Sequence, residues 1–166
     1  MIHLISCIDK NNAIGYKGKL LCKLPNDMKH FKNLTMGNFC VMGKRTYQEL
    51  EKPLEGRTTL VLSRDTTYEA HPEVFIYDSV SDIMREYREY NEEKSDVFVC
   101  GGHNVYKEFM PHAHYIHLTI VHHEFEKADA YFPAFELSEW QVVSSIFQPA
   151  DEKNKYDHSF VTYKRK

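Results

Sequence analysis

Short apolar runs, each followed by a turn and a helix-forming segment, constrain this chain more than any other feature of its sequence. Residues 1–8 are almost continuously apolar and end at the polar stretch 9–12, which is typical of a buried strand. Comparable runs predict strands at 39–42, 59–62, 74–77 and 96–100. Between and after them, helices are predicted from Pro25 onward, from Gly43 through Leu50, over 81–90 and over 104–110. This order favours a parallel sheet covered by helices.

The last third of the chain changes character, because its strand-like runs at 115–121, 140–147 and 159–164 are separated by loops without a strong helix. We also expect a loop before the Pro25 helix, carrying Ile14, Gly15 and Gly18. The predicted fold class is therefore α/β, with a mainly parallel, twisted sheet of about eight strands, an antiparallel C-terminal edge and about four flanking helices. The 166 residues suit one domain over 1–166.

Composition and charge exclude several classes of function. The net charge of −3 argues against a general nucleic-acid binder, so any site for an anion must be local. No apolar run approaches the roughly 18 residues of a membrane span, and the N-terminus lacks the basic flank and cleavage signal of a secretory peptide. The cysteines Cys7, Cys22, Cys40 and Cys100 have neither paired nor metal-type spacing, which is typical of free thiols in a reducing compartment. We therefore expect a cytoplasmic protein.

One carboxylate, that of Asp27, stands where a carboxylate is costly. Pro25 suits the first position of a helix, and Leu24, Met28 and Phe31 then recur at helical spacing to form an apolar stripe. Asp27 borders this stripe, so a ligand resting there would meet a carboxylate and little water. The alternative is that Asp27 only complements the N–H groups and the dipole of the first turn.

Three turns that follow predicted strands carry groups suited to anions. Gly43, Lys44, Arg45 and Thr46 place a glycine, two cations and a hydroxyl at a helix N-terminus, Ser63 and Arg64 end the third strand, and Gly101 and Gly102 precede the last helix. In an open α/β sheet, ligands bind at the carboxyl ends of the strands. Taken together, the turns indicate a ligand with two anionic ends, such as a dinucleotide with an extra phosphate. The alternative is that each is an ordinary turn.

Other polar residues give weaker signals. Arg57 follows the turn 53–56 and is either a ligand-binding cation or an exposed loop residue. Five histidines cluster in sequence, namely His112, His114, His117, His122 and His123. On a strand, however, they would point to opposite faces, and no cysteine or carboxylate completes a tetrahedral set, so we predict no metal site.

The ordered motifs resemble those of dihydrofolate reductase of the bacterial or phage chromosomal type, from Met1 almost to the C-terminus. The motifs that carry the resemblance are Ile14-Gly15, Leu24-Pro25 with Asp27, Phe31 and Thr35, Met42-Gly43 with Thr46, Pro53-Leu54 with Gly56-Arg57, Leu62-Ser63, Gly101-Gly102 with Tyr106, Thr119, and Phe132-Pro133. The resemblance implies NADPH-dependent reduction of 7,8-dihydrofolate to tetrahydrofolate, which supplies one-carbon and thymidylate metabolism. It also implies a monomer that binds dihydrofolate and antifolates, with no nucleic-acid or membrane partner.

The resemblance also assigns roles to residues. It implies catalytic roles for Asp27, Thr119, Leu20 and Cys22. It implies substrate contacts for Ile5, Cys7, Asp27, Met28, Phe31, Leu50, Leu54, Arg57, Cys100 and Thr119. It implies NADPH contacts for Cys7, Ile14, Gly15, Gly43, Lys44, Arg45, Thr46, Leu62, Ser63, Arg64, Cys100, Gly101, Gly102, His103, Asn104, Val105 and Tyr106.

Three departures from the family pattern bear on these roles. Leu21-Cys22 replaces the usual Pro-Trp, His103 stands where a third small residue is common, and the turn 126–129 has one residue extra. Two alternatives stay open on the sequence. One is a pyrimidine reductase of riboflavin synthesis with the same fold, which has no need of the Asp27 and Arg57 pair. The other is a catalytically weak folate-binding member, which the missing tryptophan suggests.

Overall fold

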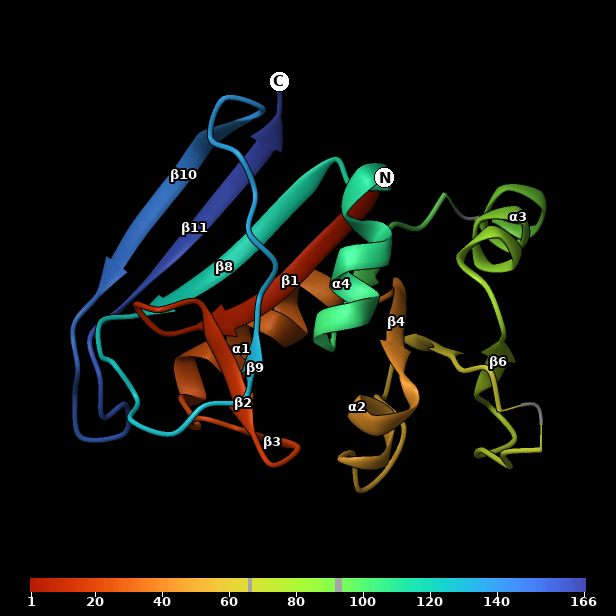
Figure 1. The fold of residues 1–166 in the computed structure, drawn as a ribbon, viewed down its shortest axis with the longest axis horizontal. Helices are drawn as coiled ribbons and strands as arrows, with labels where there is room; N and C mark the ends of the chain where they lie inside the picture. The colour runs from red at the N-terminus through yellow and green to blue at the C-terminus, as the bar shows by residue number, and fades with distance from the viewer. Residues whose placement is uncertain (66, 92–93) are drawn as a thin grey trace.

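A large twisted sheet forms the centre of the molecule (Figure 1). The computed structural model describes residues 1–65, 67–91 and 94–166. The sheet has eight strands in the order β10-β11-β8-β1-β7-β4-β5-β6. These strands are β1 (Ile2–Ile8), β4 (Phe39–Gly43), β5 (Thr58–Leu62), β6 (Phe75–Tyr77), β7 (Val97–Val99), β8 (Tyr115–Val121), β10 (Trp140–Gln148) and β11 (His158–Arg165).

The pairing of the strands confirms the predicted fold class. Every pairing from β8 through β1, β7, β4 and β5 to β6 is parallel. β11 pairs antiparallel with β8, and β10 pairs antiparallel with β11, so these two strands form the antiparallel C-terminal edge. Parallel strands buried between helices read as continuous apolar runs, and this made them recognisable from sequence.

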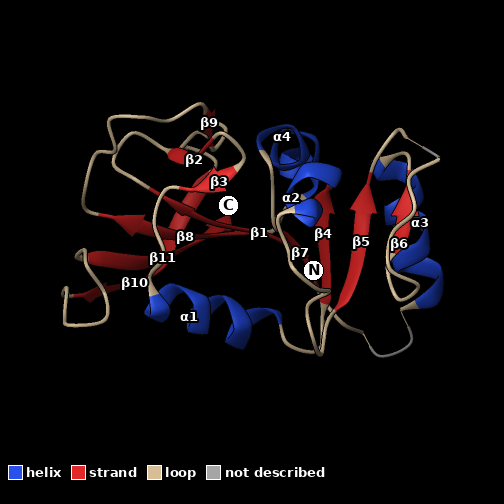
Figure 2. Cartoon of the chain, turned by 90° about the horizontal axis from the view of Figure 1, so that it is seen from below, coloured by secondary structure: helices blue, strands red, loops and turns tan. Residues whose placement is uncertain are grey.

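Four helices flank the sheet, as predicted. They are α1 (Pro25–Thr35), α2 (Lys44–Gln48), α3 (Val80–Tyr90) and α4 (His103–Phe109), and the short 3-10 helix η1 (Met110–His112) follows α4. Figure 2 shows α1 beneath the sheet and α4 above it, on opposite faces. Among the residues that the structure describes, no helix has the length and apolar character needed to cross a membrane.

The core has one cluster of side chains on each face of the sheet. Val41 and Leu60 belong to the larger cluster, which also holds Phe109 of α4 and Ile83 of α3. Their neighbours in sequence, such as Met42, belong to the smaller cluster with Tyr47, Leu50 and Leu54 packed against it. This alternation follows from the two-residue period of a strand, which sends successive side chains to opposite faces.

Part of the predicted fold is wrong, because a second, three-stranded sheet forms where loops were predicted. β2 (Ala13–Tyr16) pairs antiparallel with β3 (Lys19–Leu20) and with β9 (Ala130–Tyr131), where we expected only loops. A Cβ atom on Gly15 would lie 2.9 Å from the backbone oxygen of Lys19, so only glycine allows the two strands to approach this closely. Strands this short carry too little alternation to be recognised from sequence.

Asp9 joins this small sheet to the large one. Its side chain is 2% exposed at the end of β1. Oδ1 accepts hydrogen bonds from the backbone N–H groups of Asn11 at 2.8 Å and Ala13 at 3.0 Å, and Oδ2 accepts one from Phe125 N–H at 3.0 Å. One carboxylate therefore holds the β1–β2 turn against the chain that follows β8.

We predict that Asp9→Asn lowers the free energy of unfolding by about 1–3 kcal/mol, because an amide presents a donor to at least one of these backbone donors. Urea denaturation measures the change. Asp129→Asn is the matched control, since the exposed Asp129 accepts one backbone bond, from Lys17 N–H at 3.0 Å. The control should cost less than about 1 kcal/mol. Equal losses in the two variants would contradict the anchoring role of Asp9.

Candidate active site

A hydrogen bond between α1 and β8 brings together two catalytic candidates that lie far apart in the sequence. Thr119 Oγ1 donates to Asp27 Oδ1 at 2.6 Å. Thr119 is 2% exposed, and its register partner on β1 is Cys7. Asp27, Thr119 and Cys7 therefore meet where α1 begins beneath the carboxyl ends of β1 and β8.

The start of α1 is fixed from outside the helix. Pro25 occupies the first turn, and Leu24, the residue before it, provides no side-chain cap. The exposed N–H of Asn26 instead donates to the side-chain oxygen of Asn154 at 2.9 Å, and Asn154 is itself held by Asp151. A loop from the C-terminal hairpin thus supplies the acceptor that the first turn needs.

Burial raises the pKa of Asp27 above its ordinary value, while the bond from Thr119 opposes this shift. The sign of the linkage follows from the direction of the shift. The contribution of Asp27 to folding is most favourable below its unfolded pKa and is lost as the pH rises through the higher folded pKa. At neutral pH the ionised carboxylate therefore opposes folding, which a residue that served only as a helix start would not do.

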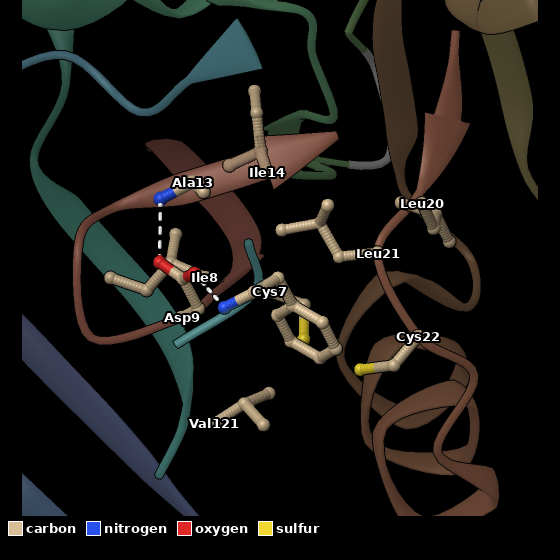
Figure 3. A pocket seen from close by; sticks show the side chains of 10 residues that line it. Cys7, Ile8, Asp9, Ala13, Ile14, Leu20, Leu21, Cys22 and Val121 are labelled. Atoms are coloured by element: carbon tan, nitrogen blue, oxygen red, sulfur yellow. Dashed lines mark hydrogen bonds between the residues drawn. The ribbon is translucent and has the colours of Figure 1, made fainter. Parts of the chain in front are cut away.

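A small pocket of about 10 Å³ opens between β1, β2 and the segment that leads into α1 (Figure 3). One of its lining residues, Cys7, is the strand partner of Thr119, which bonds Asp27. Its lining includes four predicted site residues, namely Cys7, Ile14, Leu20 and Cys22. It also includes residues that we did not predict, namely Ile8, Asp9, Ala13, Leu21, Val121 and Phe125. The sequence did carry a signal for one of them, Asp9, because this residue directly follows the first predicted strand.

The predicted apolar stripe on α1 divides into a buried and an open part. Leu24 is buried, whereas the Met28 side chain is 60% exposed and Phe31 is half-buried. The guanidinium of Arg57 lies 6.0 Å from the ring centroid of Phe31, and its Nη1 donates to Thr35 Oγ1 at 3.3 Å. A cation therefore stands at the far end of the stripe from Asp27.

The glycine turn after β7 packs closely against the end of β4. Gly43 N–H donates to Gly101 O at 2.9 Å, and the φ angle of Gly101 is 120°, in a region that favours glycine. Tyr106 Oη donates to the carbonyl of Ile5 at 2.7 Å, which ties α4 to β1. A Cβ atom on Gly43 would meet Val105 at 3.2 Å. A backbone hydrogen bond thus joins the two glycine turns.

The predicted cations beside this surface have different surroundings. Lys44 Nζ bonds Asp65 Oδ2 at 2.9 Å and lies 4.6 Å from the ring centroid of Tyr68. The hydrogen bond from Lys44 lowers the pKa of Asp65 to about 2. Arg64 is exposed next to Ser63, whose hydroxyl accepts from Asp65 N–H at 3.1 Å. An anion that bound Lys44 would therefore compete with Asp65.

The remaining candidates are placed less centrally. Leu20 is 69% exposed, and Asn104 is exposed at the start of α4. His103, also exposed, donates from Nδ1 to Tyr131 O at 2.7 Å. Cys100 packs against the smaller core cluster beside Cys40. Among the other predicted positions, Arg45 is exposed, Thr46 and Leu62 are half-buried, and Ile5 and Gly15 are buried.

His3 and His117 are buried and take part in packing, whereas His112, His114, His122 and His123 are exposed. Within the described residues, no group of three or more His, Cys, Asp or Glu side chains is arranged to hold a metal ion. His3 and His117 instead share a hydrogen bond of 2.9 Å between Nδ1 and Nε2, and His3 Nε2 lies 3.0 Å from Asp96 Oδ2. Burial lowers the pKa of His117 to about 4, so its imidazole is neutral at physiological pH.

Comparisons with known proteins agree over the whole chain. The family model described as dihydrofolate reductase matches residues 1–165. The dihydrofolate reductase of Bacillus subtilis (strain 168) is 36% identical over 168 residues, which cover 100% of this chain and 95% of the relative. That of Staphylococcus aureus is 32% identical over 158 residues, covering 95% and 94%. A solved structure of dihydrofolate reductase from Enterococcus faecalis, complexed with NADP(H) and RAB-propyl, has a TM-score of 0.92 and 36% identity, covering 99% of this chain and 96% of that one.

We predict that Thr119→Val raises the pKa of Asp27 further, because the variant loses the bond that favours the carboxylate. Carboxyl NMR titration of the folded protein measures the shift. Thr59→Val is the matched control, since the buried Thr59 hydroxyl has no partner among the described residues. The control should leave the Asp27 titration unchanged. A Thr119→Val titration identical to that of the unmodified protein would contradict the coupling.

Proposed function

Because the chain belongs to the dihydrofolate reductase family, it is an NADPH-dependent oxidoreductase that reduces 7,8-dihydrofolate to 5,6,7,8-tetrahydrofolate, and we propose that Asp27 and Thr119 hold the pterin of this substrate. The observation that carries the proposal is the carboxylate of Asp27, drawn out of water and bonded at 2.6 Å to Thr119, whose strand partner Cys7 lines the pocket. The rate of NADPH oxidation with dihydrofolate tests it directly. Reduction of a pyrimidine of riboflavin synthesis in its place would contradict it.

A carboxylate suits a pterin because the ring presents an amino group and a ring N–H side by side. One carboxylate accepts from both donors, and charge-assisted bonds of this kind are about twice as strong as neutral ones. Thr119 already donates a hydrogen bond to Asp27 Oδ1, so it fixes the plane in which the carboxylate faces the pterin ring. The role of the carboxylate is to hold the pterin and to favour protonation at N5.

The open part of the α1 stripe fits the rest of the substrate. Met28 and Phe31 present apolar surface, and Leu50 and Leu54 close the opposite side. Arg57 stands beyond Phe31 and binds the α-carboxylate of the glutamate tail. Substrates and antifolates that have an aromatic body and an anionic tail would fit these apolar side chains and this cation.

The residues along the strand ends fit NADPH. Backbone at Gly43, Gly101 and Gly102 allows close approach of a pyrophosphate, while Lys44 and Arg64 supply cations for an additional phosphate. When bound, NADPH supplies the hydride that reduces C6 of the pterin. The chain contributes the orientation of the nicotinamide, through residues such as Ile14 and Cys7, and the exclusion of water.

The wider assignments are proposals of the same kind. We assign residues 1–166 to one domain that acts as a monomer in the cytoplasm, and we carry over the catalytic, substrate and cofactor roles given for the resemblance. Cys22 in place of the usual tryptophan removes very roughly 100 Å² of apolar contact from the substrate side of the pocket. The expected consequence is weaker binding rather than a different reaction.

We predict that Asp27→Asn slows hydride transfer at neutral pH by on the order of 100-fold or more. The rate should recover partly at lower pH, because substrate protonated in solution needs less help from the protein. The unliganded variant should be at least as stable as the unmodified protein at neutral pH, since the ionised carboxylate opposes folding there. Single-turnover rates and urea denaturation across pH measure the two effects.

Glu108→Gln on α4 is the matched control, because Glu108 is exposed and distant from the pocket lining. It should leave the rate and its pH profile unchanged. Near-normal activity of Asp27→Asn would return Asp27 to the role of a helix-start residue.

We also predict a preference for NADPH over NADH that depends on Lys44 and Arg64. Changing both to alanine should weaken NADPH binding by at least about tenfold more than NADH binding, because only NADPH carries the extra phosphate. Fluorescence titration with each cofactor measures the difference. Lys107→Ala, an exposed cation on α4, should leave both affinities unchanged. Equal losses for the two cofactors would overturn the assignment of these cations.

A further inference from the structure

The four cysteines lie far apart in the sequence but form two pairs in the fold. Cys40 on β4 lies beside Cys100 in the smaller core cluster, and Cys40 is 0% exposed. Cys7 and Cys22 instead line the pocket next to Asp27, and both are half-buried. The Cys7–Cys22 pair therefore combines closeness with access from the pocket, which the Cys40 thiol lacks.

The two pocket cysteines differ in how firmly they are held. Cys7 lies in β1, where its pairing with Thr119 of β8 fixes the backbone. Cys22 lies between β3 and α1, outside any strand or helix. Figure 3 shows the Cys22 Sγ pointing across the pocket toward Cys7, and both residues belong to the pocket lining. A thiol on a strand thus faces a thiol on a segment that adjusts more readily.

The thiols also differ in reactivity. Hydrogen bonding with Cys7 lowers the pKa of Cys22, while the same pairing, together with burial, raises the pKa of Cys7 well above its ordinary value. In thiol–disulfide exchange the thiolate is the attacking species. Cys22 is therefore the thiol that reacts first, and Cys7 is placed to react second.

We propose that Cys7 and Cys22 form a reversible disulfide across the pocket by exchange with a low-molecular-weight disulfide such as glutathione disulfide. The Cys22 thiolate attacks one sulfur of glutathione disulfide, whose S–S bond breaks and releases one glutathione thiolate. The Cys7 thiol then loses its proton and attacks Cys22 Sγ, and the second glutathione leaves as a thiolate. Two cysteines are oxidised, one glutathione disulfide is reduced, and the two glutathione thiolates take up the two protons.

The disulfide itself does not depend on the activity of the protein, but its effect on turnover rests on the proposed function. A Cys7–Cys22 bond would tie the segment before α1 to β1, directly beside Asp27. Because a displacement of about 1 Å in a catalytic site costs on the order of 100-fold in rate, we expect a loss of that size on oxidation. Reduction should restore the rate.

Incubation of the full chain in glutathione buffers of increasing oxidised fraction tests the proposal. A peptide map under non-reducing conditions should show a linked Cys7–Cys22 peptide that disappears on reduction, and bound NADPH with folate should slow its formation. In Cys7→Ser, oxidation should stop at Cys22 carrying one glutathione. In Cys22→Ser, the linked peptide should be absent and the rate should keep most of its own untreated value. Cys40→Ala, which removes the core pair, should still form the Cys7–Cys22 peptide.

Two results would overturn the proposal. One is the chain without substitutions carrying glutathione on Cys22 while Cys7 stays reduced at every ratio of oxidised to reduced glutathione. The other is a linked Cys40–Cys100 peptide that accounts for the oxidation. A Cys7–Cys22 disulfide without loss of activity would instead leave the disulfide in place and contradict the assignment of this pocket to turnover, so the peptide map and the rate separate the two proposals.

Discussion

The structure around the site depends on one carboxylate that is kept in a place where its charge is unfavourable. Asp27 sits in the first turn of α1 with its pKa raised by burial, and the bond from Thr119 offsets part of that cost. The helix is positioned by groups that come from elsewhere in the chain, including Asn154, which caps Asn26 N–H. A fold selected for stability alone would place an amide or an apolar residue at this position. The contact with the pterin that we propose for Asp27 would account for this unfavourable charge.

The parallel sheet explains why residues that are distant in the sequence meet at one edge of the sheet. Parallel strands end at the same edge, so the segments after β1, β4, β5 and β7 meet there regardless of their separation in sequence. The bond from Gly43 N–H to Gly101 O joins two of the turns at this edge. One architecture thus supplies both the carboxylate that we propose for the substrate and the turns that we propose for the cofactor.

The sequence predicted the elements whose signals are local. The strands of the parallel sheet were recognisable because each is a buried apolar run, and α1 because Pro25 and Leu24 mark its start. The small sheet was missed because β3 and β9 have two residues each and depend on distant partners. Asp9 was missed for a related reason, since its third hydrogen bond comes from Phe125, far along the chain. Likewise, spacing gave no sign that the cysteines would pair, because that depends on tertiary structure.

The proposed Cys7–Cys22 disulfide would couple the oxidation state of the pocket to the protonation of Asp27. Burial raises the pKa of Asp27, and the bond from Thr119 and, to a smaller extent, the neighbouring Cys7 thiol oppose that shift. A thiol loses its donor when it enters a disulfide, so oxidation removes this stabilisation and moves the pKa of Asp27 further upward. By linkage, any condition that protonates Asp27 also weakens the preference of Cys7 for its reduced form. The two equilibria are therefore properties of one cluster of side chains, formed by α1, β1 and the segment that joins β3 to α1.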